Sequence, residues 1–265
     1  MAATPLVLLI DMDGTIIGDA SPLACMHELQ ANINARQNSL ETYPFRQSLI
    51  RPHVKSFLKF ARHEYDCECF IYTAADENWA AKVINCVEKE IGLKFNRPIL
   101  SRKDCVLVNN VYRKNISHVS SRIRSVLKRR QKFLIDSNIV LIDNNDVIFP
   151  NGDYRQIICP TYDARIGMDV LKNINITEIH ANTSALAKIL FKYGYIIKSS
   201  YKSIDELLSS YYLSVARSLH ESCKESDKIS KDTFWLDLKT AFRSLQITSF
   251  DKETLSHIRK VLKGT

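Results

Sequence analysis

The chain has 265 residues and a mass of 30.4 kDa, which suits one medium-sized domain or one domain with a smaller addition. Hydrophobic residues make up 45% of it and charged residues 25%, without any low-complexity tract, which excludes fibrous and largely disordered proteins. The net charge of +8 favours anionic partners such as phosphates, phosphoproteins or nucleic acid, but it does not choose among them.

Three features indicate where the protein works. The longest purely apolar run, residues 6–10, is far too short to span a bilayer, and the N-terminus lacks the basic segment of a secretory signal. Seven cysteines, an odd number without paired metal spacings, are typical of a reducing compartment. Among them, Cys67 and Cys69 are expected to pack in the core or at a strand edge rather than bind a metal. We therefore expect a location in the cytoplasm or nucleus and no membrane partner.

The most informative stretch is LVLLIDMDGT at residues 6–15. Its apolar run predicts a strand of a parallel sheet that is covered on both faces. Asp11 and Asp13 follow at the carboxyl end of this strand, where α/β folds gather ligands and catalysts. Two carboxylates that close repel each other unless a cation or a shared proton separates them, and Mg²⁺ suits such hard oxygen ligands. On these residues alone, an ordinary strand followed by a turn is an equally good interpretation.

Helices and strands alternate in the sequence that follows. Residues 19–50 are polar with a helical pattern around 24–33, which predicts a small flap or cap insertion. The further predicted elements are a helix opened by Arg51-Pro52-His53, a strand at 69–72, a helix at 79–91, two short strands within 98–113 around a turn at Asn109-Asn110, a basic helix at 117–132, and strands at 139–142 and 156–158. This alternation predicts an α/β fold, with a Rossmann-like parallel sheet flanked by helices.

The pattern changes at about residue 170. Helices are predicted at 183–191, 204–220, 234–245 and 254–262, and Ser203 with Glu206 has the spacing of a capping box. We therefore expect a first domain of residues 1–168, with 19–50 as its small insertion, and a helical C-terminal appendage of residues 169–265.

Further polar side chains follow the later predicted strands. Thr73 ends the strand at 69–72, Asp143 and Asn144 end the strand at 139–142, and basic residues lie near position 114. Each has an ordinary structural interpretation, since threonine is common at strand ends, lysine is usually solvated, and an Asx-rich run serves well as a turn. On these residues alone, the structural interpretations stay open.

Five segments occur in order along the chain: DMDGT at 11–15, RPHVKSFLKF at 51–60, FIYTAADENWAAKVI at 70–84, ILSRKDCVLVNNVYRKNI at 99–116 and VLIDNNDVIF at 140–149. Together they resemble the haloacid dehalogenase superfamily of phosphatases. The resemblance is closest to its NLI-interacting-factor-like branch, which contains the small C-terminal-domain phosphatases that act on RNA polymerase II. It extends over about residues 6–162, more than half of the chain.

The resemblance implies a phosphatase with four catalytic residues. Asp11 would be the nucleophile that forms an aspartyl phosphate, and Asp13 would protonate the leaving oxygen and later activate water. The hydroxyl of Thr73 would bind a phosphate oxygen. The family's lysine falls on Lys114, which would neutralise phosphate charge, with Lys103 and Arg113 as alternatives.

The resemblance also implies one cofactor, Mg²⁺. Asn144 would be a direct ligand, together with the Asp11 carboxylate and the backbone carbonyl of Asp13. Asp143 would be a second carboxylate of the metal region or would orient the other groups.

The chain departs from the family pattern at three places. Gly14 stands where the polymerase-tail phosphatases usually carry Glu, and Asn145 with Asp146 replaces a Ser-Pro pair. Residues 19–50 lack the β-rich insertion that in those enzymes helps to hold a proline-containing peptide. The resemblance therefore implies the chemistry more firmly than the substrate.

We expect a magnesium-dependent phosphomonoester hydrolase, acting on a phosphoserine or phosphothreonine protein. A nucleotide or nucleic-acid 3′-end phosphatase suits DMDGT and the net charge equally well. A third hypothesis, from another class, is a catalytically silent adaptor that binds an acidic partner, or nucleic acid, through the basic helix at 117–132 and the C-terminal helices. The presence of both Asp11 and Asp13 speaks against this hypothesis, because a binding module needs neither.

Overall fold

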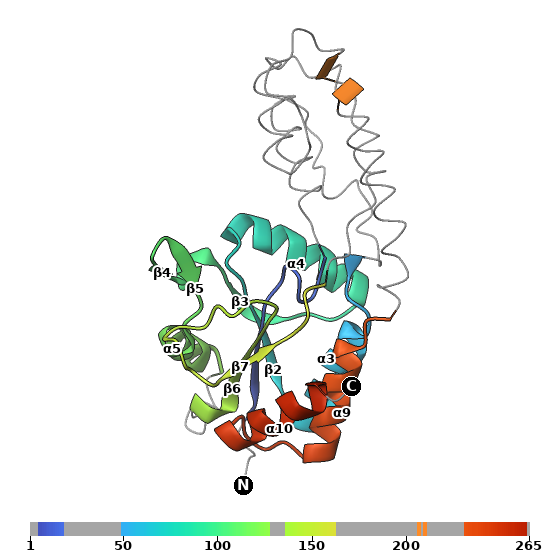
Figure 1. Cartoon of the computed structure of the whole chain (residues 1–265), viewed down its shortest axis with the longest axis vertical. Helices are drawn as coiled ribbons and strands as arrows, with labels where there is room; N and C mark the ends of the chain where they lie inside the picture. The colour runs from blue at the N-terminus through green and yellow to red at the C-terminus, as the bar shows by residue number, and fades with distance from the viewer. Residues whose placement is uncertain are drawn as a thin grey trace. The chain divides into compact units, whose positions relative to one another are not determined.

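The computed structural model of the chain describes residues 5–18, 49–127, 136–162, 206–207, 209–210 and 231–263 (Figure 1). The chain divides into two compact units, of which the first consists of residues 1–17, 50–162 and 231–265 and the second of residues 18–49 and 163–230. The predicted helices around 24–33 and at 183–191, and Ser203, lie outside the described residues. Of the predicted helix at 204–220, residues 206–207 and 209–210 are described, and they are helical.

A parallel sheet of five strands forms the centre of the first unit, in the order β3-β2-β1-β6-β7. The strands are β1 (Val7–Ile10), β2 (Glu68–Tyr72), β3 (Asn96–Leu100), β6 (Ile139–Asp143) and β7 (Gln156–Ile158). Every neighbouring pair is parallel. All four residues of β1 are buried, as its apolar run predicts for a central strand covered on both faces. The predicted α/β fold is confirmed.

Three described helices lie between successive strands along the chain: α3 (Val54–Tyr65), α4 (Glu77–Ile91) and α5 (Ile116–Leu127). The Asp76 side chain caps α4 by accepting hydrogen bonds from the backbone N–H groups of Asn78 and Trp79. Helix α5 covers one face of the sheet, where its apolar residues join alternate residues of the strands in one buried cluster: Val7, Leu9, Phe70, Leu141, Ile116, Val119 and Ile123. Beyond Leu127, the predicted basic helix lies outside the described residues.

A hairpin stands apart from the main sheet. Its strands β4 (Val106–Val108) and β5 (Val111–Arg113) pair antiparallel. Asn109 and Asn110 connect them with positive φ angles of 49° and 61°, the left-handed conformation that asparagine tolerates better than most residues. The turn predicted at these two asparagines is therefore confirmed, and the hairpin leads directly into Lys114.

The last two described helices, α9 (Phe234–Leu245) and α10 (Lys252–Lys263), pack within the first unit. Helix α9 lies against α3, where the Phe57 ring is 4.9 Å from that of Trp235 and 5.5 Å from that of Phe242, measured between centroids. The predicted helix at 234–245 is thus present with the same bounds. The predicted domain boundary at residue 168 stays a prediction, but residues 231–263 belong to the unit that contains the sheet.

Two expectations about the bulk of the chain can be compared with the described residues. Both Cys67 and Cys69 are buried free thiols, in agreement with the predicted core packing. Within the described ranges, every helix is too short or too polar to cross a bilayer.

Candidate active site

A buried lysine between two carboxylates stands at the carboxyl end of the central strands. Asp11 directly follows β1, and Asp143 is the last residue of the neighbouring parallel strand β6. The register of these two strands pairs Ile10 with Ile142. The Lys114 ammonium donates to Asp143 Oδ2 at 2.6 Å and also to Asp11 Oδ1. Asp11 is 6% exposed, and Lys114 and Asp143 are each 1% exposed. The structure therefore brings three predicted site residues into direct contact.

The backbone around Lys114 fixes the place of its side chain. Lys114 donates its N–H to the Val147 carbonyl at 2.8 Å, and its own carbonyl accepts from Phe149 N–H at 2.7 Å. The next residue, Asn115, donates its N–H to the Tyr72 hydroxyl at 3.1 Å. The Tyr72 ring also lies 5.7 Å from the lysine ammonium, within the range of a cation–π contact. The position of Lys114 is therefore fixed by the hairpin that precedes it, by backbone hydrogen bonds with residues 147–149, and by Tyr72 of β2.

One positive charge in this cluster faces two negative ones. Burial raises the pKa of Asp11 to about 6, Lys114 opposes that rise, and Asp143 adds to it. Burial by itself would lower the pKa of Lys114, but Asp11 and Asp143 outweigh burial and raise it above its ordinary value. Lys114 is therefore charged at neutral pH, and the cluster carries an excess negative charge when both carboxylates are ionised.

The excess negative charge shows whether the residues of this cluster suit the Mg²⁺ ion that the resemblance implies. A divalent cation beside Asp11 would favour its ionised form, in a place where burial disfavours it. Carboxylate, amide and backbone carbonyl oxygens are the ligands that Mg²⁺ prefers, and Asp11, Asp13 and Asn144 offer these three kinds. Among the described residues, no three His, Cys, Asp or Glu side chains converge as a ready-made metal cluster. The donors that fit Mg²⁺ are therefore one carboxylate, from Asp11, together with the Asn144 amide oxygen and the Asp13 backbone carbonyl.

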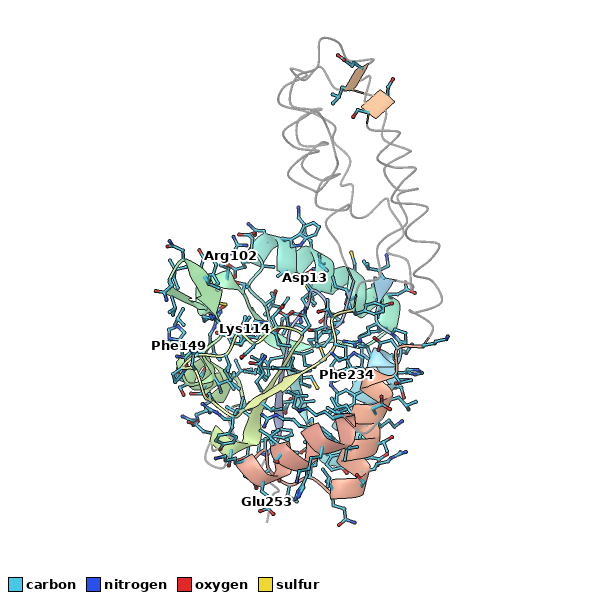
Figure 2. All side chains as sticks on the ribbon, viewed as in Figure 1. Asp13, Arg102, Lys114, Phe149, Phe234 and Glu253 are labelled. Carbon is cyan, nitrogen blue, oxygen red and sulfur yellow. The ribbon has the colours of Figure 1, made fainter. Side chains whose placement is uncertain are left out.

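A tight turn carries Asp13 away from the strand. The Met12 carbonyl accepts hydrogen bonds from the N–H groups of Ile16 at 3.0 Å and Ile17 at 3.1 Å, so the chain folds back directly after Asp11. Met12 is buried, whereas Asp13 is exposed. Figure 2 labels Asp13 and Lys114 in the upper part of the first unit, the end toward which β1 runs in Figure 1. Asp13 is therefore the aspartate of the pair that solvent reaches.

Thr73 directly follows β2, which pairs with β1 through Ile10 and Ile71. It is 2% exposed, and its hydroxyl accepts a hydrogen bond from Ala75 N–H at 3.1 Å. The register places it at the same sheet edge as Asp11, at the entry to the loop before α4. In this conformation, the Thr73 hydroxyl organises that loop.

Asn144 lies beside the turn after β1 rather than on Lys114. Its Oδ1 accepts from the Thr15 hydroxyl at 3.3 Å, and its Nδ2 donates to the Thr161 hydroxyl at 3.2 Å. Gly14 has a φ of +74°, and a Cβ placed there would lie 2.6 Å from Asn144 Nδ2. A glycine at position 14 is therefore what allows the Asn144 side chain to lie against the turn.

Replacing Gly14 with alanine is expected to destabilise the protein more than the same change at Gly152. Both glycines have positive φ, but the Cβ added at Gly152 would meet nothing within 4 Å. Strain alone costs about 1 kcal/mol at Gly152, and the displacement of Asn144 brings the cost at Gly14 to about 2–3 kcal/mol. Urea unfolding of both variants measures the difference. Equal losses at the two positions would contradict the contact with Asn144.

The two alternatives to Lys114 interact with other groups. Lys103 pairs with Glu77 at 2.5 Å, and both side chains are half exposed. Arg113 donates to the Asp146 carbonyl at 2.7 Å. Of the three candidate cations, Lys114 is therefore the one that the structure brings to Asp11 and Asp143.

Sequence reasoning missed Tyr72 and the surroundings of Arg51. Tyr72 looks like an ordinary apolar residue at the end of a strand, yet its hydroxyl donates to the Asp104 carbonyl at 2.8 Å while accepting from Asn115. Arg51 is 1% exposed and forms an ion pair with Asp232, 181 positions along the chain. For Tyr72, the sequence signal was a tyrosine at a strand end where a purely apolar residue would be sufficient. For Arg51, no nearby residue in the sequence indicates that Asp232 is its partner.

The parallel sheet, with an aspartate-lysine-aspartate cluster at its strand ends, agrees with the haloacid dehalogenase-like fold that the sequence resembles. Residues 6–182 match the family described as NLI interacting factor-like phosphatase. Since this match covers more than half of the chain, the protein belongs to that family. The resemblance inferred from the sequence is thereby confirmed.

Two solved structures are also similar to this chain. One is that of a variant of the fission yeast RNA polymerase II CTD phosphatase Fcp1 bound to beryllium fluoride, with 17% identity and a TM-score of 0.44. The other is described as the structure of Fcp1, an essential RNA polymerase II CTD phosphatase, with 17% identity and a TM-score of 0.45. In both, the match covers 91% of this chain and 62% of the other. No curated protein matches the chain.

Proposed function

We propose that the chain is a magnesium-dependent phosphomonoester hydrolase that acts through an aspartyl phosphate on Asp11. The observation that carries this proposal is the contact of the buried Lys114 with both Asp11 and Asp143 at the strand ends. A merely structural lysine would be most stable with one carboxylate, whereas this one leaves a negative charge unbalanced in a buried place. Such an arrangement suits a site that receives further positive charge together with its substrate.

The proposed reaction has two steps. An oxygen of the Asp11 carboxylate attacks the phosphorus in line, the bond from phosphorus to the ester oxygen breaks, and Asp13 gives its proton to that oxygen. Asp13 then takes a proton from water, whose oxygen attacks the phosphorus of the aspartyl phosphate. This second attack releases inorganic phosphate and regenerates the Asp11 carboxylate. The exposure of Asp13 supports its role, because protons must reach it from the solvent side.

Lys114 and Thr73 would support both steps. Lys114 holds the Asp11 carboxylate in place through one oxygen and offsets charge on the transferring group. Thr73 would offer its hydroxyl to a phosphate oxygen at the edge where β2 ends. When bound by Asp11, the Asp13 carbonyl and Asn144, Mg²⁺ would supply the positive charge that lets a carboxylate approach a phosphate dianion.

A phosphoserine or phosphothreonine protein is the substrate that we propose. Its support is family membership together with the hairpin that leads into Lys114. Three large apolar side chains are exposed on that hairpin, Leu107 (59%), Val111 (50%) and Tyr112 (40%). Such a surface suits a polypeptide better than a nucleotide. The nucleic-acid alternative is supported by DMDGT and by the net charge of +8, and the adaptor hypothesis predicts no turnover.

The test is a comparison of turnover on four phosphomonoesters. A phosphoserine peptide, a nucleoside monophosphate, a 3′-phosphorylated oligonucleotide and an aryl phosphate are each incubated with Mg²⁺ and with EDTA. We expect Mg²⁺-dependent release of phosphate, with the highest kcat/KM on the peptide. Preference for the oligonucleotide would overturn the substrate, and lack of turnover on all four would overturn the enzyme. A structure with beryllium fluoride would test whether the adduct forms on Asp11.

The location of the protein stays a prediction. We propose the cytoplasm or nucleus, in keeping with the five free cysteines among the described residues.

A further inference from the structure

We propose that the cavity beside helices α9 and α10 is a second anion site, which binds a small organic anion with a short apolar body. The cavity has a volume of about 680 Å³, within the range of small-molecule sites. It lies where the end of β7, the beginning of α9 and the end of α10 meet. Phe234, labelled in Figure 2, is the first residue of α9 and lines the cavity. None of the Asp11 cluster lines it.

Positive charge predominates in the lining. Four cationic side chains and two acidic ones contribute to it, which leaves an excess of two positive charges. Lys231, three residues before α9, and Lys263, the last residue of α10, are both exposed and line the cavity. Arg259 donates to the Gln156 backbone carbonyl at 2.7 Å, a neutral acceptor that leaves the charge of the guanidinium uncompensated. An anion in the cavity would therefore meet a favourable potential.

One cation of the lining is already balanced by a buried ion pair. Arg51 lines the cavity, and its side chain is entirely buried. Its Nε donates to Asp232 Oδ1 at 2.9 Å, and its Nη2 lies 2.9 Å from Asp232 Oδ2. Its guanidinium carbon also lies 4.8 Å from the ring centroid of Phe234, which lines the same cavity. Arg51 and Asp232 therefore balance each other, and the excess positive charge of the lining comes from Lys231, Arg259 and Lys263 against Asp237.

Apolar surface in the same cavity defines the other half of the ligand. Ile158, the last residue of the edge strand β7, is 53% exposed and lines the cavity. Phe234 and Leu262 line the cavity with it. A phosphonate, phosphate or carboxylate with a body of a few carbon atoms would satisfy both the charge and the apolar surface. The apolar side chains disfavour a bare inorganic ion.

The chain contains two tryptophans, and one of them can report on this cavity. Trp235 follows Phe234, and their ring centroids are 5.1 Å apart. The other, Trp79, lies in α4 and can be replaced with phenylalanine. In the 265-residue chain with Trp79→Phe, butylphosphonate is titrated while Trp235 fluorescence is recorded. We expect a saturable change with butylphosphonate, a weaker response to methylphosphonate, and none to butanol.

Charge variants then assign the signal to the cavity. Lys231→Gln with Lys263→Gln should raise the dissociation constant about tenfold, which corresponds to ~1.4 kcal/mol. Lys252→Gln with Lys260→Gln removes the same charge from exposed positions of α10 that do not line the cavity, and should change it less than twofold. Asp11→Asn should leave the titration unchanged, since Asp11 does not line the cavity. No saturable signal, equal effects of the two lysine pairs, or loss of the signal in Asp11→Asn would each overturn the proposal.

Discussion

Asp11→Asn is expected to abolish turnover while making the metal-free protein more stable. An amide oxygen cannot form the aspartyl phosphate, so kcat should fall by about 10⁴-fold or more. The gain in stability has an electrostatic cause. Burial raises the pKa of Asp11 from 3.8 to about 6, which means that folding at pH 7 buries an unfavourable charge. The neutral amide removes that charge and can still accept the hydrogen bond from Lys114.

The pH dependence follows from the direction of this shift. A carboxyl group whose pKa is raised by folding stabilises the folded state below about pH 4 relative to neutral pH, and this contribution is lost as the pH rises through about 6. In EDTA, Asp11→Asn should therefore exceed the natural protein at pH 7 by on the order of 2–3 kcal/mol in free energy of unfolding. The difference should shrink as the pH falls from 6 toward 4.

Urea unfolding at pH 4.5, 6 and 7.5, with EDTA or with Mg²⁺, measures the stability difference and its pH dependence. A phosphate-release assay of the same two proteins measures turnover. Mg²⁺ should stabilise the natural protein more than the variant, because the cation interacts with the ionised carboxylate. A variant that is less stable at every pH would show that the Asp11 charge is favourable in the folded state. Retained turnover would show that another residue is the nucleophile.

Lys114→Met is expected to lose both activity and stability. The methionine fills most of the same space but leaves Asp11 and Asp143 next to each other without a cation. Breaking a buried ion pair by removing one partner costs about 3–5 kcal/mol. Turnover should fall by about 10³-fold or more, because the transferring group also loses a positive charge.

Lys103→Met is the matched control, since it makes the same chemical change at a half-exposed lysine that pairs with Glu77. It should cost at most about 1 kcal/mol and leave turnover within about twofold. The double variant Asp11→Asn with Lys114→Met should recover part of the stability, because one carboxylate charge then remains. If Lys103→Met were as harmful as Lys114→Met, the assignment of the site lysine would be wrong.

The sequence alone was sufficient to predict the strands and helices that carry the site. Hydrophobic patterning is a local property, so the apolar run of β1 and the helical period of α9 could be read directly. The left-handed asparagines of the hairpin turn are another local property. In contrast, the choice of Lys114 rather than Lys103 came from the family resemblance, because spacing does not tell which lysine turns inward.

Contacts between distant segments could not be predicted. The ion pair of Arg51 with Asp232 joins residues 181 positions apart, and the Tyr72 hydroxyl contacts Asn115 from a strand 43 positions earlier. An amphipathic helix such as α9 shows that it has an apolar face, but not which surface that face covers. The helix was therefore expected in an appendage, although it packs against α3.

The chain leaves and re-enters the first unit at neighbouring points. Ile17 and Ile50 form an antiparallel bridge, so residues 18–49 begin and end side by side. The Tyr162 hydroxyl lies 3.5 Å from the Ile50 carbonyl, and Arg51 is paired with Asp232, so residues 163–230 also depart and return there. The points at which the described chain of the first unit breaks off and resumes therefore lie close together. Changes in the length of either segment can therefore leave undisturbed the strand register that aligns Asp11 with Asp143.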